Sequence, residues 1–144
     1  IVNGIQFYEE FFIEKLMNQI RSATIKTRTA AINLLTVAID DNNSFIEEIS
    51  ADDMETLFDF IGCRDIIMAD SAIVALTKII DIGLQEHIDF ILEYEKENDI
   101  TELLNSDFVE NEDIAEEIRK HAFYLVDAIE GIEPKERAYN TLDL

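Results

Sequence analysis

Apolar residues recur at three- and four-residue spacing along almost the whole chain. A period of about 3.6 residues is typical of amphipathic helices that pack on a core. The sequence contains one proline and four glycines, too few for the frequent turns of a strand-rich sandwich or barrel. The pattern therefore predicts an all-α protein. We expect helices at residues 6–21, 25–41, 44–50, 52–62, 66–82, 84–97, 99–106 and 112–130.

Residues at the ends of these segments predict where the helices begin and end. Ser44, Ser50 and Asn111 are expected N-caps, because short polar side chains accept hydrogen bonds from the first free backbone N–H groups. An acidic residue stands three positions after each serine, which is the spacing of a capping box. Gly83 and Gly131 are expected to end two of the long helices.

Three of the long helices share one pattern. It begins at Ala31, Ala72 and Ala122, and apolar residues return three, four and seven positions later in each copy. The copies begin 41 and then 50 residues apart. A repeat of two or three helices at about 40–47 residues is typical of armadillo and HEAT arrays. The leading alanine is expected to be buried, because a small residue lets a second helix cross closely.

This repeat predicts an armadillo/HEAT-type right-handed α-solenoid of about three repeats, cut from a longer array. The expected repeats occupy about residues 1–41, 42–83 and 84–131, so that residues 1–132 form the solenoid and 133–144 a loosely held polar tail. Stacking of neighbouring repeats would then produce one continuous core. A plain helical bundle is the alternative, but it has no reason to repeat a pattern at constant offsets.

The individual segments are similar to known armadillo repeats. Residues 57–65, with the apolar positions that follow up to Gly83, resemble the ninth repeat of importin-α. Residues 15–22 are similar to the family's eighth repeat, and residues 99–106 and 122–126 to its tenth. The resemblance implies a nuclear import adaptor in the cytoplasm and nucleus. It also implies that this region docks the adaptor's export receptor or nucleoporins.

The same resemblance suggests a peptide-docking face, but with a departure from the family. Cargo-binding repeats of importin-α present a Trp and, four residues later, an Asn to the groove, and no copy here keeps both. Because aromatic caging of a cation contributes about 0.5–2 kcal/mol per contact, we expect basic localisation signals to bind weakly. The expected protein-binding groove consists of Asn33, Thr36, Val37, Asp40, Asp70, Val74, Lys78, Asp81, Tyr124 and Asp127.

The charge of the chain is concentrated in its middle. The net charge is −21, and residues 40–117 hold 24 acidic and three basic residues. A surface this negative repels nucleic acid and anionic lipid and favours proteins with basic surfaces or basic segments. No run of apolar residues approaches the length that a membrane helix needs.

No pattern in the sequence indicates catalysis, a cofactor or a metal site, so an enzyme is not expected. His121 has Glu117 one turn away, which is typical of a solvated pair, and His87 has no evident partner. Cys63 is expected to be a small core residue, and a single cysteine forms no internal disulfide. Residues 40–44 resemble half of a calcium loop but lack its glycine and its final glutamate.

Two further expectations follow from the residues. An armadillo-type scaffold or regulatory subunit of a phosphatase or another signalling complex is the alternative function, and residues 28–32 and 43–46 suit both functions equally.

The first helix carries too many aromatic residues for one inward stripe. Some of these aromatics are expected to form an exposed apolar patch or a contact with another chain. They are Phe7, Tyr8, Phe11 and Phe12.

Overall fold

The computed structural model describes residues 11–137, and helices joined by short loops make up this part of the chain. No strand occurs among the described residues, so the all-α prediction is confirmed. The α-helices are α1 (Phe12–Ser22), α2 (Ile25–Asp41), α3 (Ala51–Ile61), α4 (Ile66–Ile82), α5 (Gln85–Asn98), α6 (Ile100–Leu104) and α7 (Glu116–Ile129). Short helical turns are η2 (Asn43–Glu48), η3 (Asn105–Val109) and η4 (Pro134–Glu136).

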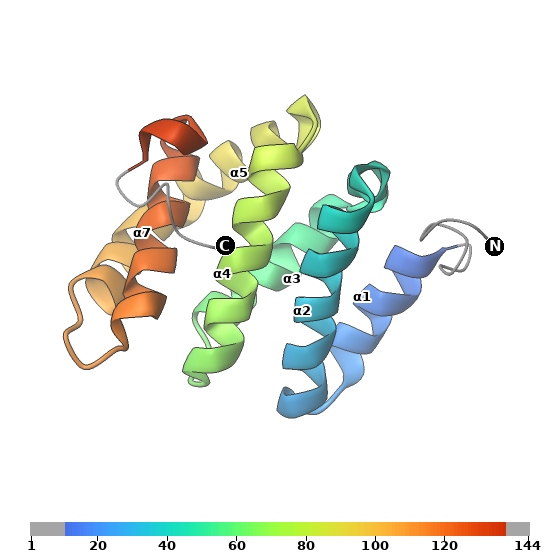
Figure 1. Ribbon diagram of the computed structural model, residues 1–144, viewed down its shortest axis with the longest axis horizontal. Coiled ribbons are helices and arrows are strands. Elements are labelled where there is room, and N and C mark those ends of the chain that lie inside the picture. Colours follow the sequence, from blue (N-terminus) through green and yellow to red (C-terminus); the bar gives the residue numbers. More distant parts are fainter. Residues whose placement is uncertain (1–10, 138–144) are drawn as a thin grey trace.

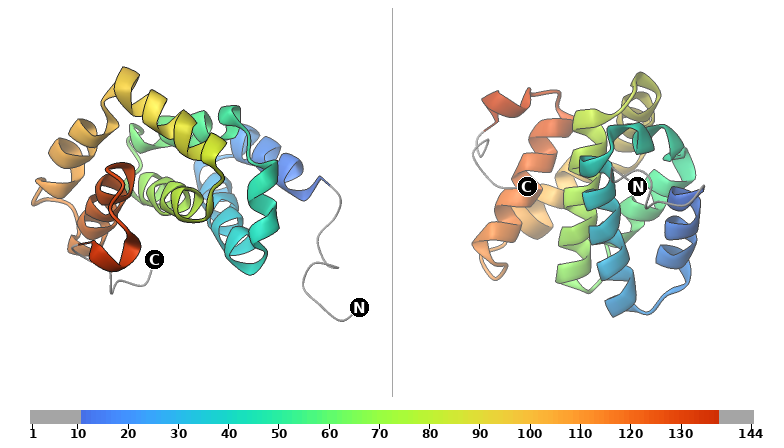
Figure 2. Two further views of the ribbon diagram at one scale, coloured as in Figure 1. Left: turned by 90° about the horizontal axis from the view of Figure 1, so that it is seen from above. Right: turned by 45° about the vertical axis from the view of Figure 1, so that its right-hand side comes forward.

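The helices form two layers (Figures 1 and 2). The long helices α2, α4 and α7 lie side by side in one layer, and α4 packs against both of the others. Helices α1, α3, α5 and α6 lie behind them, with α1 packed on α2 and α3 packed on α4. We call the outer surface of α2, α4 and α7 the long-helix face. The long helices therefore pack in the order in which they occur along the chain.

The leading alanines of the repeated pattern lie in the core, as expected. Ala31, Ala72 and Ala122 are 6%, 0% and 0% exposed. The position three residues later is less regular, since Ala75 and Leu125 are buried while Leu34 is 43% exposed. The reason is that α2 has a long helix beside it on one side only within the described residues. The flank that carries Leu34 therefore faces outward.

Side-chain hydrogen bonds cap some of the helix starts. Ser50 accepts a bond from the Asp53 N–H, and the Asp53 carboxylate accepts one from the Ser50 N–H, so the predicted capping box is present. The expectation for Asn111 was wrong, because α7 begins only at Glu116, after Ala115. Asn111 instead accepts a bond from the Asp113 N–H at 3.0 Å, a local turn that competes with helix formation. Ser44 likewise lies inside η2, whose N-cap is Asn42.

The two predicted glycine stops are correct for different reasons. Gly131 has a φ of 84°, and the N–H groups of Gly131 and Ile132 bond the carbonyls of Ala128 and Asp127, which is a Schellman ending. Gly83 ends α4 in an extended conformation. A Cβ there would lie 2.3 Å from the Ile79 carbonyl oxygen, so the close backbone approach requires glycine.

The first described helix leaves one aromatic residue exposed. Phe11 is 59% exposed, whereas Phe12 packs against the core with its ring 5.6 Å from that of Phe45. Phe7 and Tyr8 lie outside the described residues. The described residues therefore show one exposed aromatic ring, that of Phe11, and Phe12 does not belong to the expected patch.

Candidate functional site

The first part of the predicted groove lies on α2 and is open. Asn33 and Val37 are exposed, and Thr36 is half-buried with its hydroxyl directed at the Ile32 carbonyl. Together with the exposed Leu34, these residues give α2 an apolar surface bordered by an amide. Val74 on α4 is half-buried on the neighbouring helix. This part of the face can accept a partner's side chains.

The acidic residues of the predicted groove are paired within the chain. Lys78 of α4 donates to Asp40 of α2 at 3.0 Å, and the ring Nδ1 of His121 in α7 lies 2.8 Å from the carboxylate of Asp70 in α4. These pairs connect neighbouring long helices. The Lys78 ammonium therefore offsets part of the negative charge of this face.

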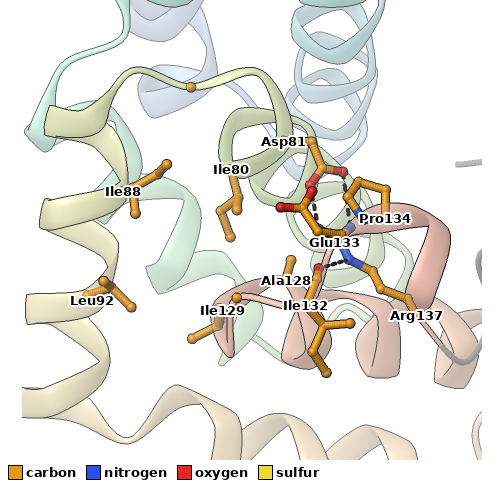
Figure 3. A pocket seen from close by; sticks show the side chains of 12 residues that line it. Ile80, Asp81, Ile88, Leu92, Ala128, Ile129, Ile132, Glu133, Pro134 and Arg137 are labelled. Carbon is orange, nitrogen blue, oxygen red and sulfur yellow. Dashed lines mark hydrogen bonds and ion pairs between the residues drawn. The ribbon is translucent and has the colours of Figure 1, made fainter.

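The seam between α4 and α7 is occupied by a residue that the sequence analysis did not single out (Figure 3). The guanidinium of Arg137 donates to both carboxylate oxygens of Asp81, at 2.6 and 3.1 Å. Its Nε donates to the Ile132 carbonyl at 2.8 Å, and its guanidinium carbon lies 4.5 Å from the centre of the Tyr124 ring. The Arg137 side chain is only 3% exposed. The expectation of a loosely held tail is therefore wrong for Arg137, and residues 138–144 lie outside the described residues.

The electrostatics of this seam favour the charged arginine. Burial by itself would lower the pKa of Arg137. The hydrogen bonds to Asp81 and its charge, with a smaller contribution from Tyr124, outweigh burial and raise the pKa of Arg137 above its usual value. The guanidinium therefore stays ionised, and the pair is a charge-assisted fork of the stronger kind.

Two of the predicted groove residues are not open to a partner. Tyr124 is 7% and Asp127 6% exposed, so both belong to the buried side of α7. The sequence pattern placed Tyr124 on the groove because it corresponds to Val74 and Asn33 in the other copies. In the structure Arg137 lies over its ring. The predicted groove is therefore open along α2, partly buried on α4 and closed at α7.

The histidines have structural partners different from those predicted. His121 pairs with Asp70 across the helices and not with Glu117 on its own helix. His87 is 1% exposed; its Nδ1 lies 3.1 Å from the Leu84 N–H and its Nε2 2.9 Å from the Ile49 carbonyl. Because a backbone N–H can only donate, Nδ1 accepts and Nε2 carries the hydrogen. This bridge fixes the start of α5 against the loop before α3.

Cys63 is partly buried beside the core, and its thiol donates weakly to the Asp65 carbonyl. No base stands next to it among its described contacts. Within residues 11–137 no group of three or more His, Cys, Asp or Glu side chains is placed to hold a metal ion. None of the described helices combines the length and the apolar character needed to cross a membrane.

A second surface combines acidic and aromatic side chains between α3 and α5. A hollow of about 520 Å³ is lined by Glu55, Asp59, Phe90, Glu93, Tyr94, Glu97 and Asn98. The Tyr94 ring stacks on Phe58 with centroids 4.4 Å apart. Burial, then the charges of Asp59 and Glu55, raise the pKa of Tyr94 above its ordinary value of 10.0. We call this hollow the acidic hollow; the sequence analysis anticipated its charge but not its location.

Comparisons with protein-family models, curated proteins and solved structures find no significant match to this chain.

Proposed function

We propose that this protein is a protein-binding adaptor module of the armadillo-like α-solenoid type, similar to the C-terminal repeats of importin-α. The observation that carries the proposal is the layer of α2, α4 and α7. Three helices with the same apolar pattern pack side by side, each with its leading alanine buried. Such a layer presents one continuous surface to a partner, which is how repeat arrays bind proteins.

The charge distribution supports basic partners. Within the described residues, the four carboxylates of the acidic hollow have no cationic partner among the ion pairs, unlike Asp40, Asp70 and Asp81 on the long-helix face. Unpaired acids raise the association rate of a basic protein and make its binding sensitive to salt. A folded partner with a basic surface, such as an export receptor, would use these acids and the open part of the long-helix face together.

The proposal includes a weak response to isolated basic peptides. Aromatic caging is absent from the open part of the face, because Asn33 and Val74 stand where the family's cargo-binding repeats have the rings that hold a cation. The acids nearest to this surface are already paired. The geometry therefore favours a module that docks folded basic partners over a reader of localisation signals. The cytoplasm and nucleus are the location that the resemblance to importin-α implies.

The test is a titration of the full chain with a basic localisation peptide and with a folded protein of basic surface, each at low and moderate salt. We expect the folded protein to bind more tightly and both affinities to fall with salt. Neutralising the acidic hollow by Glu93→Gln and Glu97→Gln should slow association of the folded protein. Glu14→Gln on α1 removes a similar exposed charge and serves as the control.

Two outcomes would contradict the proposal. Tight, salt-resistant binding of the peptide would mean that the long-helix face reads localisation signals directly. Absence of binding for both ligands would favour the scaffold or regulatory-subunit function. Of the residues that suited that alternative, Arg28 caps α1 by donating to the Ile20 carbonyl at 2.7 Å, and Phe45 and Ile46 are buried.

A further inference from the structure

The segment that follows α7 is anchored by one buried side chain. Residues 133–136, which include η4, are exposed to solvent, and Arg137 at their end is buried. Its guanidinium lies against residues from three places in the chain: Asp81 in α4, Tyr124 in α7 and the carbonyl of Ile132. Asp81, Tyr124 and the Ile132 carbonyl thus form a receptor site that holds the Arg137 side chain.

The receptor has the chemistry of an arginine site. A carboxylate that accepts two parallel N–H bonds matches the planar fork of a guanidinium. The aromatic face of Tyr124 supports the flat cation, and a backbone carbonyl accepts the remaining Nε–H. A lysine ammonium cannot make this forked pair with one carboxylate. The contacts that Arg137 makes are therefore those of an arginine site.

An apolar cleft adjoins the arginine site (Figure 3). Its volume is about 380 Å³, and Arg137 and Asp81 form one edge of it. Ile88 and Leu92 of α5 lie on the opposite side, and Leu92 is 48% exposed. The cleft is large enough for an aliphatic side chain placed near an arginine. The complete surface therefore fits an arginine that has a large apolar neighbour.

We propose that the α4–α7 seam is a binding site for an arginine of a partner protein and that Arg137 occupies it in the absence of the partner. The partner segment carries an arginine beside a large apolar residue, and it binds by displacing Arg137. The inference rests on the proposed function only in taking the ligand to be a protein. It goes further because it names an arginine of the partner as the recognised residue and Arg137 as the competitor within the chain.

Competition with Arg137 sets the size of the expected effect. A tethered competitor acts at a high effective concentration, on the order of millimolar for a short linker. The apparent affinity of an external ligand is reduced by the fraction of molecules in which the site is open. If Arg137 occupies the site most of the time, its removal raises the affinity for an arginine peptide by about tenfold or more.

The experiment measures the binding of two fluorescent peptides to variants of the 144-residue chain. One peptide has a single arginine between two leucines with glycine–serine ends, and its twin has citrulline, which keeps the shape of arginine but lacks its charge. We expect Arg137→Ala to bind the arginine peptide about tenfold or more tightly than the unmodified chain. Arg137→Ala combined with Asp81→Asn should lose this gain, and the citrulline peptide should bind neither. Lys135→Ala removes a charge from the same exposed segment and is the matched control.

A purely structural role of Arg137 predicts other results. Equal affinity of the unmodified chain and Arg137→Ala, or equal binding of the two peptides, would overturn the proposal. Arg137→Lys keeps a cation without the forked pair and should give an intermediate gain with an intact helical circular dichroism spectrum. Loss of the fold in both Arg137 variants would also overturn it. If a folded basic protein still binds in these cases, the proposed adaptor function stands and only the arginine site fails.

Discussion

At the scale of single residues, the contacts that distinguish this protein are between groups far apart in the sequence. Arg137 pairs with Asp81 across 56 positions, and His121 pairs with Asp70 across 51. Each of these pairs lies at a seam between helices, where solvent is partly excluded. Pairs of this kind are costly to break on one side, because the remaining charge is left without its partner. The loss of stability caused by a single substitution in one of these pairs therefore measures how strongly the pair joins its two parts of the chain.

Tyr94 gives a pH-dependent prediction at this scale. Its pKa is raised by burial, Asp59 and Glu55, so the folded chain retains the phenol proton at a pH where the unfolded chain has lost it. Stability linked to Tyr94 is present below its ordinary value of 10.0 and is lost as the pH rises through the folded-state pKa. Urea unfolding of Tyr94→Phe should show a shallower decline above this pH than the unmodified chain.

Asp59→Asn provides the complementary measurement. Removing this negative charge lowers the pKa of Tyr94 toward its ordinary value, because the tyrosinate is then repelled less. The change appears as an earlier rise of tyrosinate absorbance in an alkaline titration. A titration curve identical to that of the unmodified chain would show that Asp59 does not act on Tyr94.

Gly83 gives a second prediction for a single residue. A Cβ at this position meets the Ile79 carbonyl oxygen at 2.3 Å, so Gly83→Ala forces the end of α4 to shift. We expect a loss of about 1–3 kcal/mol in the free energy of unfolding, measured by urea denaturation. Gly62→Ala is the control, since its nearest such contact is at 3.9 Å and its φ is negative. Equal effects of the two substitutions would refute the steric explanation.

At the scale of the elements, helix starts combine local caps with contacts to other helices. The Ser50–Asp53 capping box begins α3, and the carboxylate of Asp53 also pairs with Arg21 of α1 at 2.6 Å. Arg28 caps the C-terminal end of α1, because it donates to the carbonyls of Ile20 and Arg21. Its guanidinium carbon also lies 4.9 Å from the centre of the Phe60 ring in α3. The caps thus fix both the ends of the helices and their relative placement.

The cap at Ser50 can be tested by substitution. Ser50→Ala removes the acceptor for the Asp53 N–H and should lower the free energy of unfolding by about 1 kcal/mol. Asp53→Ala should cost more, because it also leaves Arg21 without its carboxylate. Ser44→Ala is a useful comparison, since Ser44 is not the N-cap of η2 and the change should lie within about 0.5 kcal/mol of zero. Equal losses at Ser44 and Ser50 would argue against the capping box.

At the scale of the whole molecule, the stability of the layers depends on close contacts between repeated helices. Ala72 is fully buried on α4, which packs on α2, α3 and α7. Because protein interiors are closely packed, a larger side chain at this buried position has no free space to enter.

Ala72→Leu tests this organisation. Overpacking should lower the free energy of unfolding by about 1–3 kcal/mol. Ala30→Leu adds the same side chain at an exposed position of α2 and should change stability little. Thermal and urea denaturation of both variants provide the measurement. A tolerated leucine at position 72 would be incompatible with close crossing at the leading alanines.

Much of this architecture could be predicted from the sequence. The expected helix at 25–41 has the bounds of α2, and that at 66–82 has the bounds of α4. The burial of Ala31, Ala72 and Ala122 also followed from the repeated pattern. These features depend on residues within one or two turns of each other, so the local period and the caps contain enough information. The late start of α7 was missed because the turn at Asn111 competes with the helix.

The candidate site could be predicted only in part. The sequence by itself determined the helices, the apolar stripes and the concentration of acidic residues between positions 40 and 117. Only the tertiary structure decided that Lys78 and His121 pair with acids of the groove, that Tyr124 is covered, and that Arg137 lies in the seam. The physical reason is that a helical period specifies which face of a helix a residue occupies. The charged or polar group that meets that residue comes from a distant part of the chain, brought there by packing of the apolar faces.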